Sequence, residues 1–192
     1  MKRAIFPLPV FILPSGYTRL RIFEPRYLAM VKESLKKNQG FVLCTYRHDR
    51  EFNVSNHGCL MNIIDFDQDK SGQLLIDIYA ETAVSINNVY QDQQQLRHAD
   101  ITRCAPPTWY SNTEIADKHQ SLSRVLTALF ANNSQLADLY RDAHFDNLAW
   151  VVARWLEVLP ISIDKKQQLA HESNFENLLS FLHTLINNEF AN

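Results

Sequence analysis

The chain has 192 residues, of which 46% are hydrophobic and 11% aromatic, and its formal net charge at pH 7 is −2. This composition can bury a sizeable core, which argues against an intrinsically disordered protein. The near-balance of basic and acidic residues gives no general reason to expect a nucleic acid or an anionic membrane as partner, and no run approaches the ~18 apolar residues of a membrane span.

The cysteines and the N-terminus indicate where the protein resides. Cys44, Cys59 and Cys104 are odd in number and widely spaced, so they do not suggest a disulfide framework. A reduced compartment fits this pattern. The basic start and the apolar run after it look like a signal peptide, but several prolines between Ile5 and Pro14 and the lack of a cleavage site argue against one. We therefore expect a cytoplasmic protein.

The N-terminal region leads into a helix that begins with proline. Residues 5–13 contain two prolines and are predicted to be extended, at a sheet edge or in a bulged strand. Pro25 suits a first helical turn, where its missing N–H has no partner, and Glu24 is placed to cap that helix. Gly40 is expected just past the helix end. The residues predicted to form the buried stripe are Leu28, Val31 and Leu35.

Alternating apolar residues predict a β-rich region as far as about residue 110. Residues 41–46 are rich in β-formers and predict a central strand. Residues 59–66 and 73–80 flank a polar turn and predict a hairpin, because alternate positions of the second strand are apolar. The further strands predicted are residues 83–90 and 96–104.

From about residue 117 the apolar period changes from two to 3.6, which predicts helices. A Ser-x-x-Glu pattern at Ser173–Glu176 has the form of a capping box. The helices predicted are residues 122–130, 148–159, 162–171 and 173–186. We therefore expect an α+β protein with a β-rich subdomain over residues 1–116 and a helical subdomain over residues 117–192.

Several segments resemble a known family. In the first half they are Ile5–Val10, Leu13–Gly16 and Arg21–Leu28, and in the second half Trp155–Ser162. The most specific residues are Arg21, Ile22, Phe23, Glu24, Pro25, Arg26 and Tyr27. On these residues the chain resembles the N-terminal, substrate-binding domain of the ATP-dependent protease Lon, and in particular the short bacterial proteins that carry this domain by itself.

The resemblance implies a PUA-like pseudo-barrel followed by a helical bundle, and a non-catalytic module that binds protein or peptide segments, linked to proteolysis or protein quality control. It implies no cofactor. The expected partners are unfolded or extended protein segments, or another protein; a membrane is not expected and nucleic acid is disfavoured. The chain has only four glycines, none spaced as a phosphate-binding loop, so we expect neither the ATPase nor the serine–lysine protease of Lon.

Cysteine and histidine residues allow two alternatives. The potential metal ligands that lie closest in sequence are Cys44, His48, His57 and Cys59. Their spacing is a poor match to zinc modules, and apolar strands favour packing of cysteine as a small hydrophobe. A small hydrolase could instead use Cys104 with His98 or His119, but an unreactive thiol is the favoured interpretation.

Aromatic and basic side chains are the candidates for contact with a partner. Trp109 and Tyr110 follow two prolines and either form an exposed patch or seal the two halves together, which is favoured. A PUA-like RNA-binding protein is a further alternative, in which Arg19, Arg21 and Arg26 contact phosphate, but such a site usually needs a broader basic face. The residues predicted to bind peptide are Phe11, Tyr17, Phe23, Arg26, Tyr27, Trp109 and Tyr110.

Within the Arg21–Tyr27 motif the expected roles differ. We expect Glu24 to cap the helix and Phe23 to lie in the core, although Phe23 stays among the contact candidates. Arg26 and Tyr27 are expected to point outward. Apolar contact is the predicted binding mode, and addition of a strand at an open sheet edge is a second one.

Overall fold

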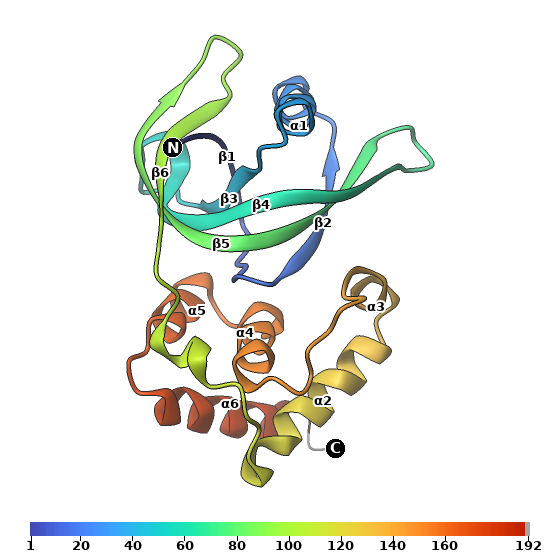
Figure 1. The fold of residues 1–192 in the computed structure, drawn as a ribbon, viewed down its shortest axis with the longest axis vertical. Coiled ribbons are helices and arrows are strands. Elements are labelled where there is room, and N and C mark those ends of the chain that lie inside the picture. Colours follow the sequence, from blue (N-terminus) through green and yellow to red (C-terminus); the bar gives the residue numbers. More distant parts are fainter. Residues whose placement is uncertain (191–192) are drawn as a thin grey trace. The chain divides into compact units, whose positions relative to one another are not determined.

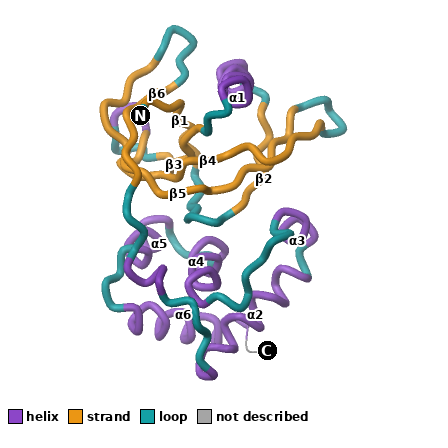
Figure 2. The backbone as a smooth tube through the Cα atoms, in the orientation of Figure 1, coloured by secondary structure: helices purple, strands orange, loops and turns teal. Residues whose placement is uncertain are grey.

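The computed structural model describes residues 1–190 and divides into two compact units. The first, Met1–Ala105, is called the β unit; the second, which begins at Pro106, is called the helical unit. Figures 1 and 2 show the strands in the first and most helices in the second. This content confirms the predicted α+β class. The subdomain boundary expected at residues 116 and 117 stays a prediction.

The β unit contains one sheet and one long helix. Its elements are β1 (Lys2–Leu8), β2 (Tyr17–Ile22), α1 (Pro25–Lys37), β3 (Phe41–Tyr46), a 3₁₀ turn (Glu51–Asn53), β4 (Val54–Gln68), β5 (Leu74–Gln91) and β6 (Arg97–Arg103). The strand order is β2-β5-β4-β3-β1-β6, and β5 also pairs with β6. The last five strands of this order therefore close into a barrel, and β2 extends the sheet as an edge strand beside β5.

Strand β5 is longer than predicted and carries a bulge. The two strands expected over residues 73–80 and 83–90 are one continuous strand. Along β4, Leu60 pairs with Thr82, whereas the next residue, Met61, pairs with Ala80. One additional residue in β5 thus lies between these pairs, and such a residue changes which face the rest of a strand presents.

The bulge lets β5 contribute to two separate cores. Before it, Ile76 and Ile78 lie in a cluster with α1, and after it, Val84 and Ile86 lie inside the barrel. The α1 core contains Phe6, Leu20, Ile22, Tyr27, Met30, Val31, Phe41, Leu43, Cys59, Met61, Ile76, Ile78, Ala80 and Leu96. The barrel core contains Ile5, Val42, Cys44, Val54, Leu60, Val84, Ile86, Ala99 and Ile101.

Two glycines are required because a neighbouring backbone carbonyl lies close to them, and not because either ends a helix. The expectation for Gly40 is wrong, because α1 ends at Asn38, whose left-handed backbone (φ 48°) turns the chain. A Cβ at Gly40 would lie 2.2 Å from the carbonyl oxygen of Met61, and one at Gly58 would lie 2.5 Å from that of Leu43. Both glycines therefore let β3 and β4 pack at their observed distance.

The helical unit contains five helices after two short turns in its described part. They are the 3₁₀ turns Thr108–Ser111 and Asp117–His119, then α2 (Gln120–Ala131), α3 (Ser134–Leu139), α4 (Leu148–Val158), α5 (Ile163–Ala170) and α6 (Phe175–Phe190). Asn147 and Ser162 cap α4 and α5 by accepting from backbone N–H groups. At α6 the acceptor is Asn174 and not Ser173, since the Asn174 side chain lies 3.1 Å from the Glu176 nitrogen.

Two tryptophans anchor the helical unit. Trp155 Nε1 donates to the carbonyl of Leu122 at 2.9 Å, and Trp109 Nε1 donates to that of Ala170 at 3.0 Å. Both side chains are fully buried, so these bonds satisfy donors that have no access to water. None of the helices in residues 1–190 combines the length and the apolar character needed to cross a bilayer.

Candidate functional site

Helix α1 buries a different face from the one predicted. Its buried residues are Tyr27, Met30 and Val31, while Leu28 and Leu35 are 40% and 48% exposed. Successive residues turn by about 100° around a helix, so Val31 belongs to both stripes and the apolar pattern alone permits either. Tyr27 decides the phase, because its ring stacks on Phe6 in the α1 core with centroids 3.9 Å apart.

The motif forms the corner between β2 and α1. Arg21, in β2, forms an ion pair at 3.1 Å with Asp69 in the β4–β5 turn, and the Ile22 side chain is buried in the core. Glu24 occupies the cap position, but its carboxylate makes no capping bond and instead lies 2.6 Å from Arg26. The expectation of a capping side chain is therefore wrong, since the neighbouring guanidinium takes that carboxylate.

Tyr27 and Phe23 exchange the places expected for them. Tyr27 is buried, and this burial raises its pKa, which the charges of Arg26 and Arg97 partly offset. The Arg26 guanidinium lies 4.8 Å from the Tyr27 ring centroid, so its outward position is confirmed only in part. Phe23 is 63% exposed, because it lies in the link between β2 and α1 and not on a packed face.

Exposed apolar side chains gather on the side of the sheet that carries α1. Phe66 of β4 is 64% exposed and pairs with Ile76, a residue of the α1 core. Directly paired residues point to the same face of a sheet, so Phe66 faces the α1 side. The other three exposed residues are Phe23, just before α1, and Leu28 and Leu35 on α1. We call Phe23, Leu28, Leu35 and Phe66 the apolar surface.

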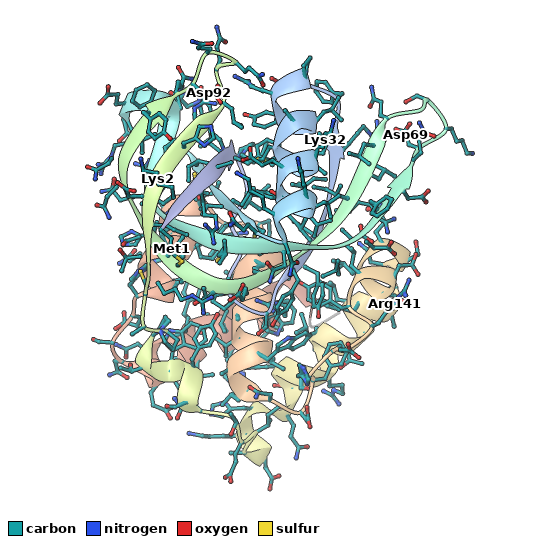
Figure 3. All side chains as sticks on the ribbon, turned by 45° about the horizontal axis from the view of Figure 1, so that its top comes forward. Met1, Lys2, Lys32, Asp69, Asp92 and Arg141 are labelled. Carbon is teal, nitrogen blue, oxygen red and sulfur yellow. The ribbon has the colours of Figure 1, made fainter. Side chains whose placement is uncertain are left out.

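The two flanks of α1 differ in chemistry. Glu33 and Lys37 line a pocket with β1 on one flank, where Arg26 also reaches the Gln95 carbonyl. Leu28 and Leu35 lie on the other flank together with Lys32, because helical residues three, four and seven apart share a face. Figure 3 shows Lys32 on the flank turned toward the β4–β5 hairpin, and Figure 1 shows α1 between the two long hairpins.

The other predicted contact residues are less exposed. Phe11 and Tyr17 are half-buried, and the Tyr17 ring lies 4.9 Å from that of Tyr79. Trp109 is buried and Tyr110 half-buried within the helical unit. An exposed patch at Trp109 is therefore wrong, because its ring stacks on Phe175 at 6.0 Å and its N–H is bonded.

Two of the candidate thiols are buried, and the two histidines considered with Cys104 already have partners. Cys44 and Cys59 are buried, and burial raises the pKa of Cys44 to about 12, so it is a thiol and not a thiolate at neutral pH. His98 lies 2.9 Å from Asp92, and His119 lies 2.8 Å from His183. Each of these two candidate histidines is thus engaged with another side chain of its own unit. Over residues 1–190 there is no cluster of three or more potential metal ligands.

The arginines proposed for RNA contact are held in ion pairs. Arg19 makes two bonds to Asp77, at 2.6 and 2.7 Å. Arg21 and Arg26 pair with Asp69 and Glu24. These carboxylates neutralise the charges that would attract phosphate, which favours a structural role for all three arginines.

The family model of the ATP-dependent protease La (Lon) substrate-binding domain matches residues 2–188. The chain belongs to this family. Members are substrate-binding modules of the Lon type and are non-catalytic, as the sequence resemblance implied. No curated protein sequence matched the chain.

Two solved Lon N-terminal domains share the fold. One, a Lon N-terminal domain protein from Xanthomonas campestris, is 24% identical with a TM-score of 0.70, over 96% of this chain and 98% of that one. The N-terminal domain of Mycobacterium avium complex Lon protease is 12% identical with a TM-score of 0.64, over 99% of this chain and 100% of that one. In this Lon-type domain the Arg21–Tyr27 motif forms the corner between β2 and α1. The sequence pattern does not show that Leu28, Leu35 and Phe66 are exposed.

Proposed function

We propose that this Lon-type domain binds unfolded or extended segments of client proteins through the apolar surface. The supporting observation is that Phe23, Leu28, Leu35 and Phe66 are each 40–64% exposed on one side of the β unit. Clustered large apolar side chains in contact with water mark interaction sites. Basic Lys32 lies on the same flank, so clients that combine apolar and acidic residues are expected to bind best.

The size of the surface predicts weak, transient capture. Burying a fully exposed Leu or Phe side chain contributes about 1.5–3 kcal/mol. Scaled by the exposed fractions of the four residues, the gain is about 5 kcal/mol before the cost of ordering the client is subtracted. A single contact of this kind corresponds to a Kd of about 1 mM or weaker. Such binding suits a module that holds a client briefly and releases it.

A second mode is strand addition at β2. This strand is at the end of the sheet order and pairs with β5, so an extended client segment could continue the sheet beyond it. In either mode we infer a cytoplasmic role in proteolysis or protein quality control, with no cofactor and with a PUA-like barrel as the supporting scaffold.

The proposal is tested with the triple variant Phe23→Ser/Leu28→Ser/Phe66→Ser. Binding of a reduced, alkylated and fluorescently labelled protein that cannot fold is measured by anisotropy. We expect the variant to lose at least about tenfold in affinity, since it removes most of the apolar contact. Its circular dichroism is expected to match the parent, because the changed residues are exposed.

The matched control is Tyr90→Ser, which removes an exposed aromatic residue outside the apolar surface. Its affinity for the unfolded protein is expected to equal that of the parent. Unchanged binding by the triple variant, or an equal loss in the control, would contradict the proposed site.

A further inference from the structure

A second site, independent of the apolar surface, is the pocket on the opposite flank of α1. It has a volume of about 150 Å³ and lies between β1, the second half of α1 and β6. The lining residues with polar side chains are Lys2, Arg3, Glu33, Ser34, Lys37, Gln39 and His98. A cavity of this size holds a ligand as large as benzene. It is therefore large enough for phosphate or a small carboxylate.

Most charges around the pocket already have partners. Lys37 forms an ion pair with Glu33, the one carboxylate among the lining residues. His98 is paired with Asp92, and the Lys2 ammonium lies 5.8 Å from the centroid of the Tyr90 ring. Figure 3 shows Lys2 and Asp92 on this same side of α1.

Arg3 is the exception. Its Nη1 donates to the Lys2 carbonyl at 2.8 Å, and within the described part of the chain it has neither a second hydrogen bond nor an ion pair. Its Nε is buried and has no acceptor. A buried guanidinium N–H without a protein acceptor is energetically costly, so this donor favours an acceptor from solvent, whether water or an ion.

Other lining residues can donate further hydrogen bonds to an anion bound beside Arg3. The Ser34 hydroxyl and the Lys2 ammonium can both donate into the pocket, and the Lys37–Glu33 pair bounds it. A planar guanidinium offers adjacent N–H groups that match the oxygens of a carboxylate or phosphate. Arg3 itself lines the pocket.

We propose that this pocket binds a small free oxyanion, either phosphate or a small carboxylate, with Arg3 as its principal ligand. Lys2 and Ser34 contribute secondary contacts. This site is distinct from the apolar surface, so client binding and oxyanion binding can succeed or fail separately.

The test uses the full chain, labelled with ¹⁵N and titrated with sodium phosphate while sodium chloride keeps the ionic strength constant. We expect saturable amide shifts confined to β1, β6 and the second half of α1. Arg3→Gln is expected to raise the Kd at least tenfold, and Arg3→Lys less, because it keeps the charge but loses the fork. Parallel titration with sodium acetate decides between the two anions, the tighter one being the preferred ligand.

Arg47→Gln is the control, because Arg47 pairs with Asp49 on an exposed loop away from the pocket. Its Kd is expected to equal that of the parent. The proposal is overturned by linear shifts with both anions, or by an equal Kd in Arg3→Gln. If Arg3→Gln does not fold, Lys2→Gln and Arg3→Lys decide the question by the same criterion, a Kd above that of the parent.

Discussion

A buried ion pair in α4 provides a sharp test of the energetics of the helical unit. The side chains of Arg154 and Glu157 are 0% and 9% exposed, and Arg154 Nη2 lies 2.8 Å from Glu157 Oε1. The Tyr140 hydroxyl donates to the same carboxylate at 3.2 Å, and the guanidinium lies 5.5 Å from the Trp150 ring centroid. Burial is the largest single influence on the pKa of Arg154 and lowers it, but the charge and hydrogen bond of Glu157 together with Tyr140 and Tyr110 outweigh burial, so the net shift is upward.

Removing either charge takes from the other the ion-pair partner that lies 2.8 Å away in the interior. We expect Arg154→Met and Glu157→Gln each to lower the free energy of unfolding by about 3–5 kcal/mol, the cost of breaking a buried pair on one side. The double variant removes both charges, and Gln can still accept from Tyr140. It is expected to cost only about 0–2 kcal/mol, which gives a coupling energy of several kcal/mol.

The cycle is measured by urea unfolding of the four proteins at pH 7, followed by tryptophan fluorescence and far-ultraviolet circular dichroism. Agreement of the two probes supports treating the transition as two-state. A double variant that costs as much as the two single variants together would refute the argument, because it would show that the charges do not depend on each other.

Three further perturbations are informative. Gly58→Ala is expected to lower stability by at least about 2 kcal/mol, because its Cβ would lie 2.5 Å from the Leu43 carbonyl oxygen; an unchanged melting temperature would contradict this. Burial lowers the pKa values of His119 and His183 below 6.5, so stability is full above pH 6.5 and declines as pH falls through the lowered values; His183→Asn should flatten this decline in acid titrations followed by fluorescence. Trp109→Phe removes one buried hydrogen bond, and chemical unfolding should show a loss of about 1–3 kcal/mol, whereas no loss would argue against that bond.

The architecture follows largely from periodicity. Alternation predicted the hairpin of β4 and β5, and the 3.6-residue period predicted α2, α4, α5 and α6. The phase of α1 could not be obtained this way, because apolar residues lie on two adjacent faces and the choice depends on Phe6, a residue of another strand. The sequence did not predict that two expected strands form the single strand β5 with a bulge, because the bulge depends on the pairing with β4.

The residues of the candidate site are harder to predict from the sequence than the fold is. Phe66 belongs to a predicted strand, and it is exposed in a part of β4 that lies beyond the residues paired with β3. The prediction that Leu28 and Leu35 are buried depends instead on the helical stripe that they share with Val31. The sequence did not distinguish Asn174 from Ser173 as the cap of α6, because Asn and Ser suit that role about equally and the two residues are adjacent. Burial, not residue type, separates contact residues from core residues here.

The family motif and the proposed binding residues therefore carry different information. Ile22 and Tyr27 are fixed by packing, and Arg21 and Glu24 by ion pairs. Such residues identify the fold because few alternatives preserve the corner. Phe23 is the one large hydrophobic side chain of the motif that is exposed, and it links the structural motif to the apolar surface.

The additional residue of β5, Glu81, has a consequence for how chains of this fold can vary in length. The residues beyond Glu81 face the barrel because Glu81 stays unpaired with β4. Deleting it would remove the bulge but leave the later residues opposite the same β4 partners, so Val84 and Ile86 would still face the barrel core and only the local bend of β5 would be lost. Related chains should gain and lose residues freely in the turn between β4 and β5, whereas between Ala80 and Val84 we expect the present spacing with a bulge, or a spacing one residue shorter without it.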